Sequence, residues 1–275
     1  MSEYAAPGLA DEIRNATVPA GAAAIWWLGQ ASFALKGGGA TVYVDPYLQV
    51  SDRRMSPPPF APSAIDHADI VVVTHDHLDH VDPNTLPGIA AASSATRFVA
   101  PRPIAGRVAE LVGSADRVFS ALADVPMRLT TPGGTVELLP TPAKHEEFNE
   151  TPEGYPYLGY TIRLGDVTIH HSGDTIPYEG QIERVRAHAV DVALLPINGR
   201  DFYRTRRGIL GNFDYREAAD FAAAIDAKLV VPMHYGMFAA NTVPPGHFVS
   251  YLAEQYPHVA AHVMGRFGRL VYTRP

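Results

Sequence analysis

The chain has 275 residues, of which 47% are hydrophobic, so it can bury a substantial core and is not expected to be intrinsically disordered. Its 29 acidic and 22 basic side chains give a net charge of −7, which argues against a dedicated nucleic-acid-binding protein, because the surface of such proteins is usually basic. The sequence contains no cysteine, which excludes disulfides, thiolate metal ligands and cysteine nucleophiles.

Neither a membrane span nor a secretory signal is predicted. No apolar run approaches ~18 residues, and the first residues, MSEYAAPGLADEIRNATV, lack a basic segment followed by an apolar one. A cytoplasmic protein without a membrane partner is therefore expected. No linker or shift of composition divides the chain, so residues 1–275 are expected to form one domain.

The first half of the chain predicts mostly strands, because 24 prolines and 23 glycines divide the sequence into short elements. The continuous apolar run 69–74 is typical of a buried strand. A helix is expected to begin at Pro83, with Asp82 as its N-cap, since proline suits the first helical position. The other predictions are strands at 25–28, 32–35, 41–44, 98–100, 117–120, 127–130 and 135–139, and a helix at 104–112.

The second half alternates strands with helices. Asp214 and Glu217 fit a capping box that opens a helix running to about residue 227. The other predictions are strands at 157–164, 167–171, 190–196 and 229–232, helices at 178–188 and 248–255, and a terminal pair of strands at 258–264 and 269–273. Segments 33–45 and 160–174 both read strand, glycine turn, strand, aspartate, which leaves an internal duplication and a chance similarity equally open.

The strongest chemical signal is the run His75-Asp76-His77-Leu78-Asp79-His80. It directly follows the buried strand at 69–74, and the carboxyl ends of strands are where α/β proteins usually bind ligands. His75 and His77 project to one side of an extended backbone, while Asp79 and His80 come after a turn and can face a second point. Neutral imidazoles and carboxylates suit zinc, manganese or iron, so the run predicts a metal site rather than solvated histidines.

This HxHxDH motif resembles that of the metallo-β-lactamase superfamily. The resemblance implies a four-layer αβ/βα sandwich of the α/β class, with one or two divalent ions at one edge. It implies two ligand sets, with a carboxylate bridging them and a further aspartate supporting the site from behind. These are His75, His77 and His145 for one ion, Asp79, His80 and His234 for the other, Asp174 as the bridge, and Asp45 as the support.

Rival assignments exist for some of these residues. His145 can also be read as a loop histidine, and His170 and His171 compete with Asp174. The remaining histidines lack a comparable context and are expected to be surface or structural residues: His67, His188, His247, His258 and His262.

Longer stretches resemble the bacterial L-ascorbate-6-phosphate lactonases. WLGQASFAL, VDPYL, DVALLPINGR and VPMHYGMFAANT carry this resemblance, which spans residues 25–242. It implies a homo-oligomeric, manganese-associated hydrolase that opens a phosphorylated sugar lactone with a metal-bound hydroxide, with Asp79 able to accept a proton. The N-acylphosphatidylethanolamine phospholipases share the WLG, DP and HxHxDH spacing. The sequence lacks G-x-S-x-G and the G-x-x-x-x-G-K-[ST] phosphate loop.

A small anionic substrate needs a basic partner. Residues 200–207 carry four arginines and one aspartate, and arginine forks suit phosphate. The segment follows the strand at 190–196, which predicts a position near the metal edge, although a solvated loop or a subunit contact fits equally well. The predicted substrate-binding residues are Asn198, Arg200, Tyr203 and Arg204.

Two other functions stay open at this point. The first is a phosphodiesterase or phospholipase with the same metal site, for which no amphipathic membrane-facing segment is evident. The second is a metal-binding protein without catalysis. Zinc and manganese are both compatible with the predicted ligands.

Overall fold

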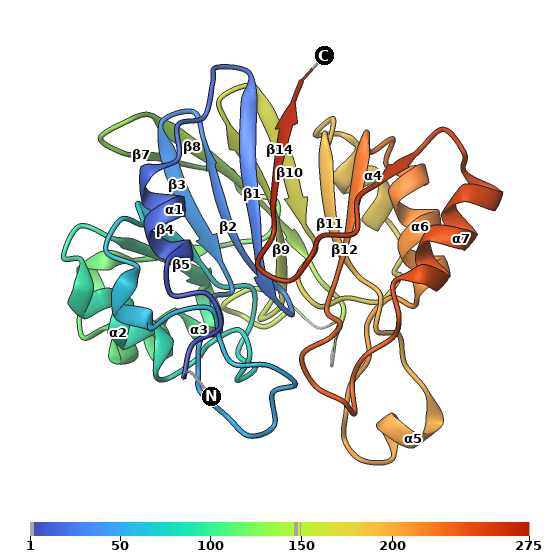
Figure 1. Ribbon diagram of the computed structural model, residues 1–275, viewed down its shortest axis with the longest axis horizontal. Coiled ribbons are helices and arrows are strands. Elements are labelled where there is room, and N and C mark those ends of the chain that lie inside the picture. The colour runs from blue at the N-terminus through green and yellow to red at the C-terminus, as the bar shows by residue number, and fades with distance from the viewer. Residues whose placement is uncertain (1–2, 146–147, 149, 275) are drawn as a thin grey trace.

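A computed structural model describes residues 3–145, 148 and 150–274, and shows two sheets packed face to face between layers of helices (Figure 1). The first sheet contains, in order across it, β14 (Arg269–Thr273), β1 (Ala22–Gly29), β2 (Ser32–Gly37), β3 (Ala40–Val44), β4 (Ile70–Val72), β5 (Arg97–Pro101) and β6 (Val118–Ala121). The second contains β13 (Ala260–Ala261), β12 (Leu229–Met233), β11 (Val192–Pro196), β10 (Val167–His171), β9 (Leu158–Leu164), β8 (Thr135–Pro142) and β7 (Met127–Thr130).

The two sheets correspond strand by strand. From β14 to β3 neighbouring strands are antiparallel, and from β3 to β6 they are parallel. The second sheet repeats this pattern, antiparallel from β7 to β10 and parallel from β10 to β13. The hairpin β2–β3 leads to Asp45 as β9–β10 leads to Asp174. The similarity of 33–45 and 160–174 thus reflects equivalent positions in the fold, which favours an internal duplication.

Helices cover the outer faces of both sheets (Figure 1). On the first sheet these are α1 (Leu9–Asn15), α2 (Thr85–Ala92) and α3 (Arg102–Val112), with the short turns Pro62–Ala64 and Ala115–Arg117. On the second sheet they are α4 (Gln181–Arg186), α6 (Tyr215–Ala224) and α7 (Gly246–Gln255). The predicted four-layer αβ/βα sandwich is therefore present. No helix in the described part of the chain is long and apolar enough to cross a bilayer.

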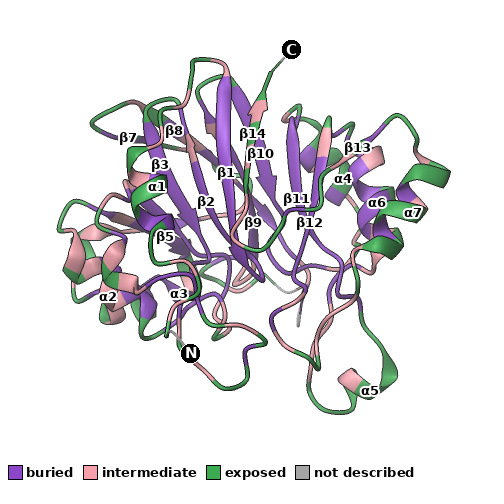
Figure 2. Ribbon diagram, in the orientation of Figure 1, coloured by how far each residue is buried: buried purple, intermediate pink, exposed green. Residues whose placement is uncertain are grey.

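Burial on both faces explains the apolar strands. Every residue of β1 is buried, as Figure 2 shows for most of both sheets. Ile25 and Trp27 pack into the core between the sheets, whereas Trp26 and Leu28 pack under α1 and its neighbours. Successive side chains of a strand point to opposite faces, so a strand covered on both sides reads as a continuous apolar run.

Several element boundaries differ from the sequence predictions. The terminal strands do not pair with each other, because β13 joins β12 while β14 joins β1 at the edge of the other sheet. Helix α2 begins at Thr85, and Asp82 instead accepts a 2.9 Å hydrogen bond from the Asn84 N–H just before it. The capping box of α6 is present as predicted, with Asp214 and Glu217 bonded reciprocally.

Candidate metal centre

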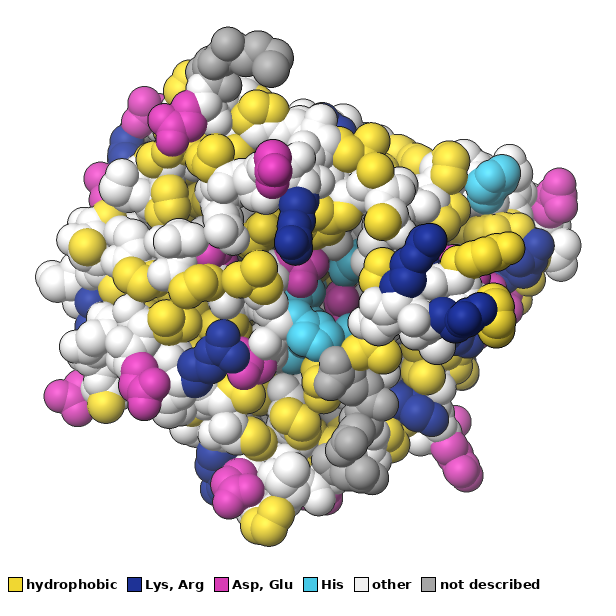
Figure 3. Space-filling model, turned by 90° about the horizontal axis from the view of Figure 1, so that it is seen from below, with side chains coloured by type: hydrophobic (Ala, Val, Ile, Leu, Met, Phe, Trp, Pro, Cys, Tyr) yellow, Lys and Arg dark blue, Asp and Glu magenta, His cyan; other side chains and the backbone are white. Residues whose placement is uncertain are grey.

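The predicted ligands come from loops that follow four different strands. The run 75–80 follows β4, His145 follows β8, Asp174 follows β10 and His234 follows β12. These strand ends meet at one edge of the sandwich, so residues far apart in sequence come together. Figure 3 views this edge from below and shows histidine and acidic side chains in a hollow near its centre.

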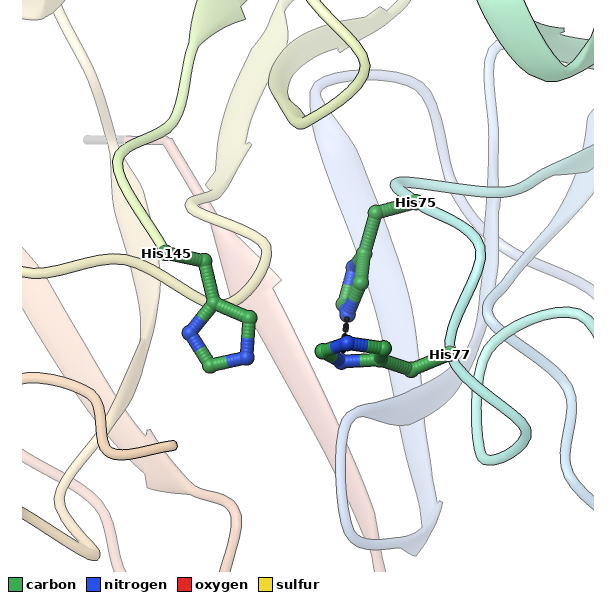
Figure 4. A group of neighbouring side chains, drawn as sticks. All are labelled: His75, His77 and His145. Atoms are coloured by element: carbon green, nitrogen blue, oxygen red, sulfur yellow. Dashed lines mark hydrogen bonds between the residues drawn. The ribbon is translucent and has the colours of Figure 1, made fainter. Parts of the chain in front are cut away.

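The side chains form three overlapping groups, in each of which the potential ligand atoms lie within 4.8 Å of one another. The groups are His75, His77 and His145; His75, His80 and Asp174; and Asp79, His80 and His234. The first and third coincide with the two ligand sets that the superfamily resemblance implies. Figure 4 shows His75 and His77 approaching each other, with Nε2 of His75 3.0 Å from Nδ1 of His77 and His145 facing both.

Asp174 lies at the centre of the cluster. Its Oδ2 is 3.0 Å from Nε2 of His234, 3.6 Å from Nε2 of His80 and 3.7 Å from Nε2 of His145. Burial raises the pKa of Asp174, but the imidazoles of His234 and His80 outweigh it and hold this pKa well below its ordinary value. The carboxylate is thus ionised. It lies within 3.7 Å of His145 in the first group and of His80 and His234 in the third group, where a bridging ligand would be held.

The donor set fits a divalent cation. Burial lowers the pKa of His75 well below its ordinary value and that of His145 to about 4, so these imidazoles are neutral and keep a free lone pair. Nε2 of His80 and Oδ1 of Asp174 are enclosed by protein and have no hydrogen-bond partner among the described residues. Buried polar atoms without partners are costly, and a cation bound to these imidazole and carboxylate atoms removes that cost.

Asp45 supports His80 from behind. Its Oδ2 is 2.7 Å from Nδ1 of His80, and the same carboxylate accepts hydrogen bonds from the N–H of Thr74 at 2.8 Å and from its Oγ1 at 2.7 Å. This contact turns Nε2 of His80 toward Asp79 and Asp174. Burial lowers the pKa of His80, but the carboxylates of Asp45, Asp174 and Asp79 together raise it well above its ordinary value.

Three residues at the edge that carries the site have left-handed backbone conformations. Gln30, Asp45 and His234 have φ angles of 54°, 45° and 62°, and each directly follows a strand, β1, β3 or β12. Non-glycine residues in this region cost about 1–3 kcal/mol each and persist where the surrounding structure fixes them. The left-handed turn after each strand directs the three side chains toward the edge that the two sheets share.

Sequence reasoning missed the roles of two residues of this site. Gln30 is fully buried, with Nε2 3.1 Å from Nε2 of His234 and 3.2 Å from Oδ2 of Asp79. His171 contacts the carbonyl of Ala31 at 2.8 Å and accepts the N–H of Gly173 at 3.1 Å, so it holds the turn that carries Asp174. Gln30 stands in WLGQASF, where a buried polar residue directly after an apolar strand is the signal that could have identified it.

Tyr157 and His170 also have defined places. The ring of Tyr157 lies 5.2 Å from that of His75 and 5.8 Å from that of His145, so it packs against the ligand set. His170 is 2.9 Å from Oγ1 of Thr161 and belongs to none of the three groups. Its imidazole is therefore part of the core.

The hollow over the cluster has a volume of about 260 Å³. It is lined by His77, Leu78, Asp79, His145, Asp174, Gly208, Ile209, Leu210, His234 and Asn241. Apart from the histidines, no basic side chain of the described residues belongs to this lining. The hollow therefore combines a carboxylate–imidazole floor with a partly aliphatic wall.

The four predicted substrate-binding residues lie outside this lining. Arg200 forms two bonds of 2.6 and 2.5 Å with the carboxylate of Glu217, and Tyr203 is 72% exposed in the segment around α5 (Phe202–Thr205) (Figure 2). Arg204 and Asn198 instead contact Asn241, which does line the hollow. Asn241 lies in the stretch MHYGMFAANT. The sequence prediction placed the substrate contacts in and beside the arginine-rich segment and did not include Asn241.

The fold and the site define a metallo-β-lactamase-type metal site, and residues 40–235 match the model of the Beta-lactamase superfamily domain. The UPF0173 metal-dependent hydrolase of Hyperthermus butylicus is 30% identical over 236 residues, which cover 83% of this chain and 90% of that protein. That of Caldivirga maquilingensis is 30% identical over 238 residues, covering 86% and 93%. The chain therefore belongs to the UPF0173 metal-dependent hydrolase family of the metallo-β-lactamase superfamily.

Solved structures agree on the fold. Igni18, a metallo hydrolase from Ignicoccus hospitalis, superposes with a TM-score of 0.71 at 21% identity, covering 92% of this chain and all 100% of that one. An isothiocyanate hydrolase from Delia radicum gut bacteria also gives 0.71, at 14% identity, covering 91% and 99%. At these identities the likeness concerns the architecture alone.

Proposed function

We propose that this metal-dependent hydrolase opens a small lactone ring. The observation that carries the proposal is the size of the hollow, about 260 Å³, directly above the histidine–aspartate cluster. Ligand pockets usually span ~300–1,000 Å³, so this one suits a molecule of sugar size better than a phospholipid. The resemblance of WLGQASFAL, PINGR and MHYGMFAANT to the L-ascorbate-6-phosphate lactonases supports the same choice.

Divalent ions held by these residues would lower the pKa of water toward ~7 and polarise a carbonyl oxygen. In lactone hydrolysis, the water oxygen bonds to the carbonyl carbon, the ring C–O bond breaks, and a water proton ends on the departing ring oxygen. Asp79 can carry that proton, because its side chain is 22% exposed and lines the hollow. The Nε2 of Gln30, 3.2 Å from Oδ2 of Asp79, fixes the orientation of this carboxylate.

We expect Asp79→Asn to lower lactone hydrolysis by about 10²–10⁴-fold, the usual contribution of a positioned proton carrier. Asp76→Asn is the matched control, because Asp76 stands in the same run but pairs with Arg107 at 2.6 Å outside the three groups. The assay strips the protein with chelator, restores Mn²⁺ or Zn²⁺, and offers L-ascorbate-6-phosphate, an unphosphorylated lactone and a phosphodiester.

Metal-dependent lactone opening that Asp79→Asn removes and Asp76→Asn keeps supports the proposal. Cleavage of the phosphodiester alone overturns the lactone assignment in favour of a phosphodiesterase. Turnover of none of the three substrates by metal-loaded protein also contradicts it.

The phosphate-binding role predicted for Arg200 has its own test. Because its guanidinium is already paired with Glu217, we expect Arg200→Ala to change kcat/KM for the phosphorylated lactone by less than about fivefold, as for other exposed ion pairs. The unphosphorylated lactone serves as the comparison. A loss of a hundredfold confined to the phosphorylated lactone would show that Arg200 leaves Glu217 to grip the phosphate.

A further inference from the structure

Asn241 presents one fixed end of its amide to the hollow. Its Oδ1 accepts a 2.9 Å hydrogen bond from Nδ2 of Asn198 and a 3.0 Å hydrogen bond from Nη1 of Arg204. An amide oxygen has two lone pairs, so both acceptor positions of Oδ1 are in use.

The neighbours prevent this amide from turning over. A guanidinium can only donate, so Arg204 must face an oxygen. Asn198 donates from Nδ2 to the same oxygen, while its own Oδ1 accepts Nδ2 of Asn212 at 3.1 Å. Turning Asn241 by 180° would place its NH₂ group against two donors and lose both hydrogen bonds.

The NH₂ group of Asn241 is therefore its free end. No hydrogen bond within the described residues uses its Nδ2, and this nitrogen is not among the enclosed polar atoms that lack a partner, so it faces open space. Asn241 lines the hollow together with Asp79, Asp174 and His234. Among the described side chains that line this hollow it is the one amide, beside the aliphatic Leu78, Ile209 and Leu210.

We infer that Asn241 is a specificity-determining residue that donates a hydrogen bond from Nδ2 to a ring hydroxyl oxygen of the substrate; this inference rests on the proposed lactone hydrolysis. The scissile carbonyl must reach the histidine–aspartate floor, so an amide on the wall meets a different oxygen. A neutral donor suits a neutral acceptor, which selects hydroxylated lactones over unsubstituted ones. Arg204 acts as a positioning residue that ties Asn241 to the segment whose residues 208–210 line the same hollow.

The test compares glucono-δ-lactone, which carries ring hydroxyls, with δ-valerolactone, which has none, in metal-restored protein. Asn241→Ala is expected to lower kcat/KM for glucono-δ-lactone by about 10- to 100-fold, the effect of losing one hydrogen bond to a buried polar group. The loss for δ-valerolactone is expected to be at least about tenfold smaller. Arg204→Leu, which frees one lone pair of Oδ1, should shift the same ratio in the same direction by less. An equal effect of Asn241→Ala on both lactones overturns the inference.

Calorimetric binding of glucono-δ-lactam, which the enzyme does not consume, separates this inference from the proposed function. We expect Asn241→Ala to weaken lactam binding about tenfold or more. If wild-type protein turns over neither lactone yet binds the lactam in a manner that depends on Asn241, lactone hydrolysis fails and the hydrogen bond stands. Unchanged lactam binding in Asn241→Ala, or no binding by the wild type, overturns the role of Asn241.

Discussion

Asp174→Ala is expected to lower both metal affinity and the rate of hydrolysis by more than about 100-fold. Side chains that only hydrogen-bond to a metal ligand already change metal affinity or activity by ~10–100-fold, and a direct ligand should matter more. The reason is its central place, with Oδ2 within 3.7 Å of His80, His145 and His234. Removing this carboxylate leaves the two outer groups without a shared anion. The measurements are the metal-to-protein ratio after dialysis and the rate of lactone opening.

Asp166→Ala is the control for this variant. Asp166 lies in the exposed turn between β9 and β10, at the opposite end of the hairpin that leads to Asp174. It should keep wild-type metal content and rate. Retention of both properties by Asp174→Ala would contradict the central position assigned to this residue.

Asp45→Asn is expected to weaken metal binding by about 10–100-fold although Asp45 belongs to none of the three ligand groups. An amide can no longer offer two anionic oxygens to the Thr74 donors and to Nδ1 of His80, so the imidazole loses its fixed orientation. The variant is also expected to be less stable by about 1–3 kcal/mol, because polar atoms in a fully buried position lose partners. Competition with a metal-sensitive dye measures the affinity, and denaturant unfolding measures the stability.

Asp69→Asn separates these two effects. The Asp69 carboxylate accepts the N–H of Thr41 at 2.8 Å, at the opposite end of β3 from Asp45. This substitution should reduce stability while leaving metal affinity unchanged. Equal metal affinity in the Asp45 and Asp69 variants would mean that Asp45 has only a structural role.

Local patterns in the sequence predicted most elements of the fold but not all of their partners. Hydrophobic runs located the central strands, and the Asp214–Glu217 pair located the start of α6, because these signals act over a few residues. The pairing of β14 with β1 joins opposite ends of the chain and leaves no local trace. The adjacent position of β13 and β14 in the sequence therefore suggested a hairpin that does not form.

The same contrast between local signals and long-range contacts applies to the metal centre. The run 75–80 concentrates its ligands in one loop, so its chemistry was readable, and the downstream positions of His145, Asp174 and His234 followed from the resemblance. The arginine-rich segment was readable as a charge cluster, but its partners were not. Arg200 pairs with Glu217 and Arg204 with Asp201 and Asn241, and these contacts depend on how distant loops meet.

The most direct test of the account is the anomalous scattering of a crystal grown with Mn²⁺ or Zn²⁺. We expect anomalous peaks at the cluster, with ligand distances of about 2.0–2.2 Å. The ligands are the set of His75, His77 and His145, the set of Asp79, His80 and His234, or both, with Asp174 in contact with each ion bound. A metal-saturated crystal without a peak at this cluster, or with its ions bound only elsewhere, would contradict the assignment of the metal centre and the function built on it.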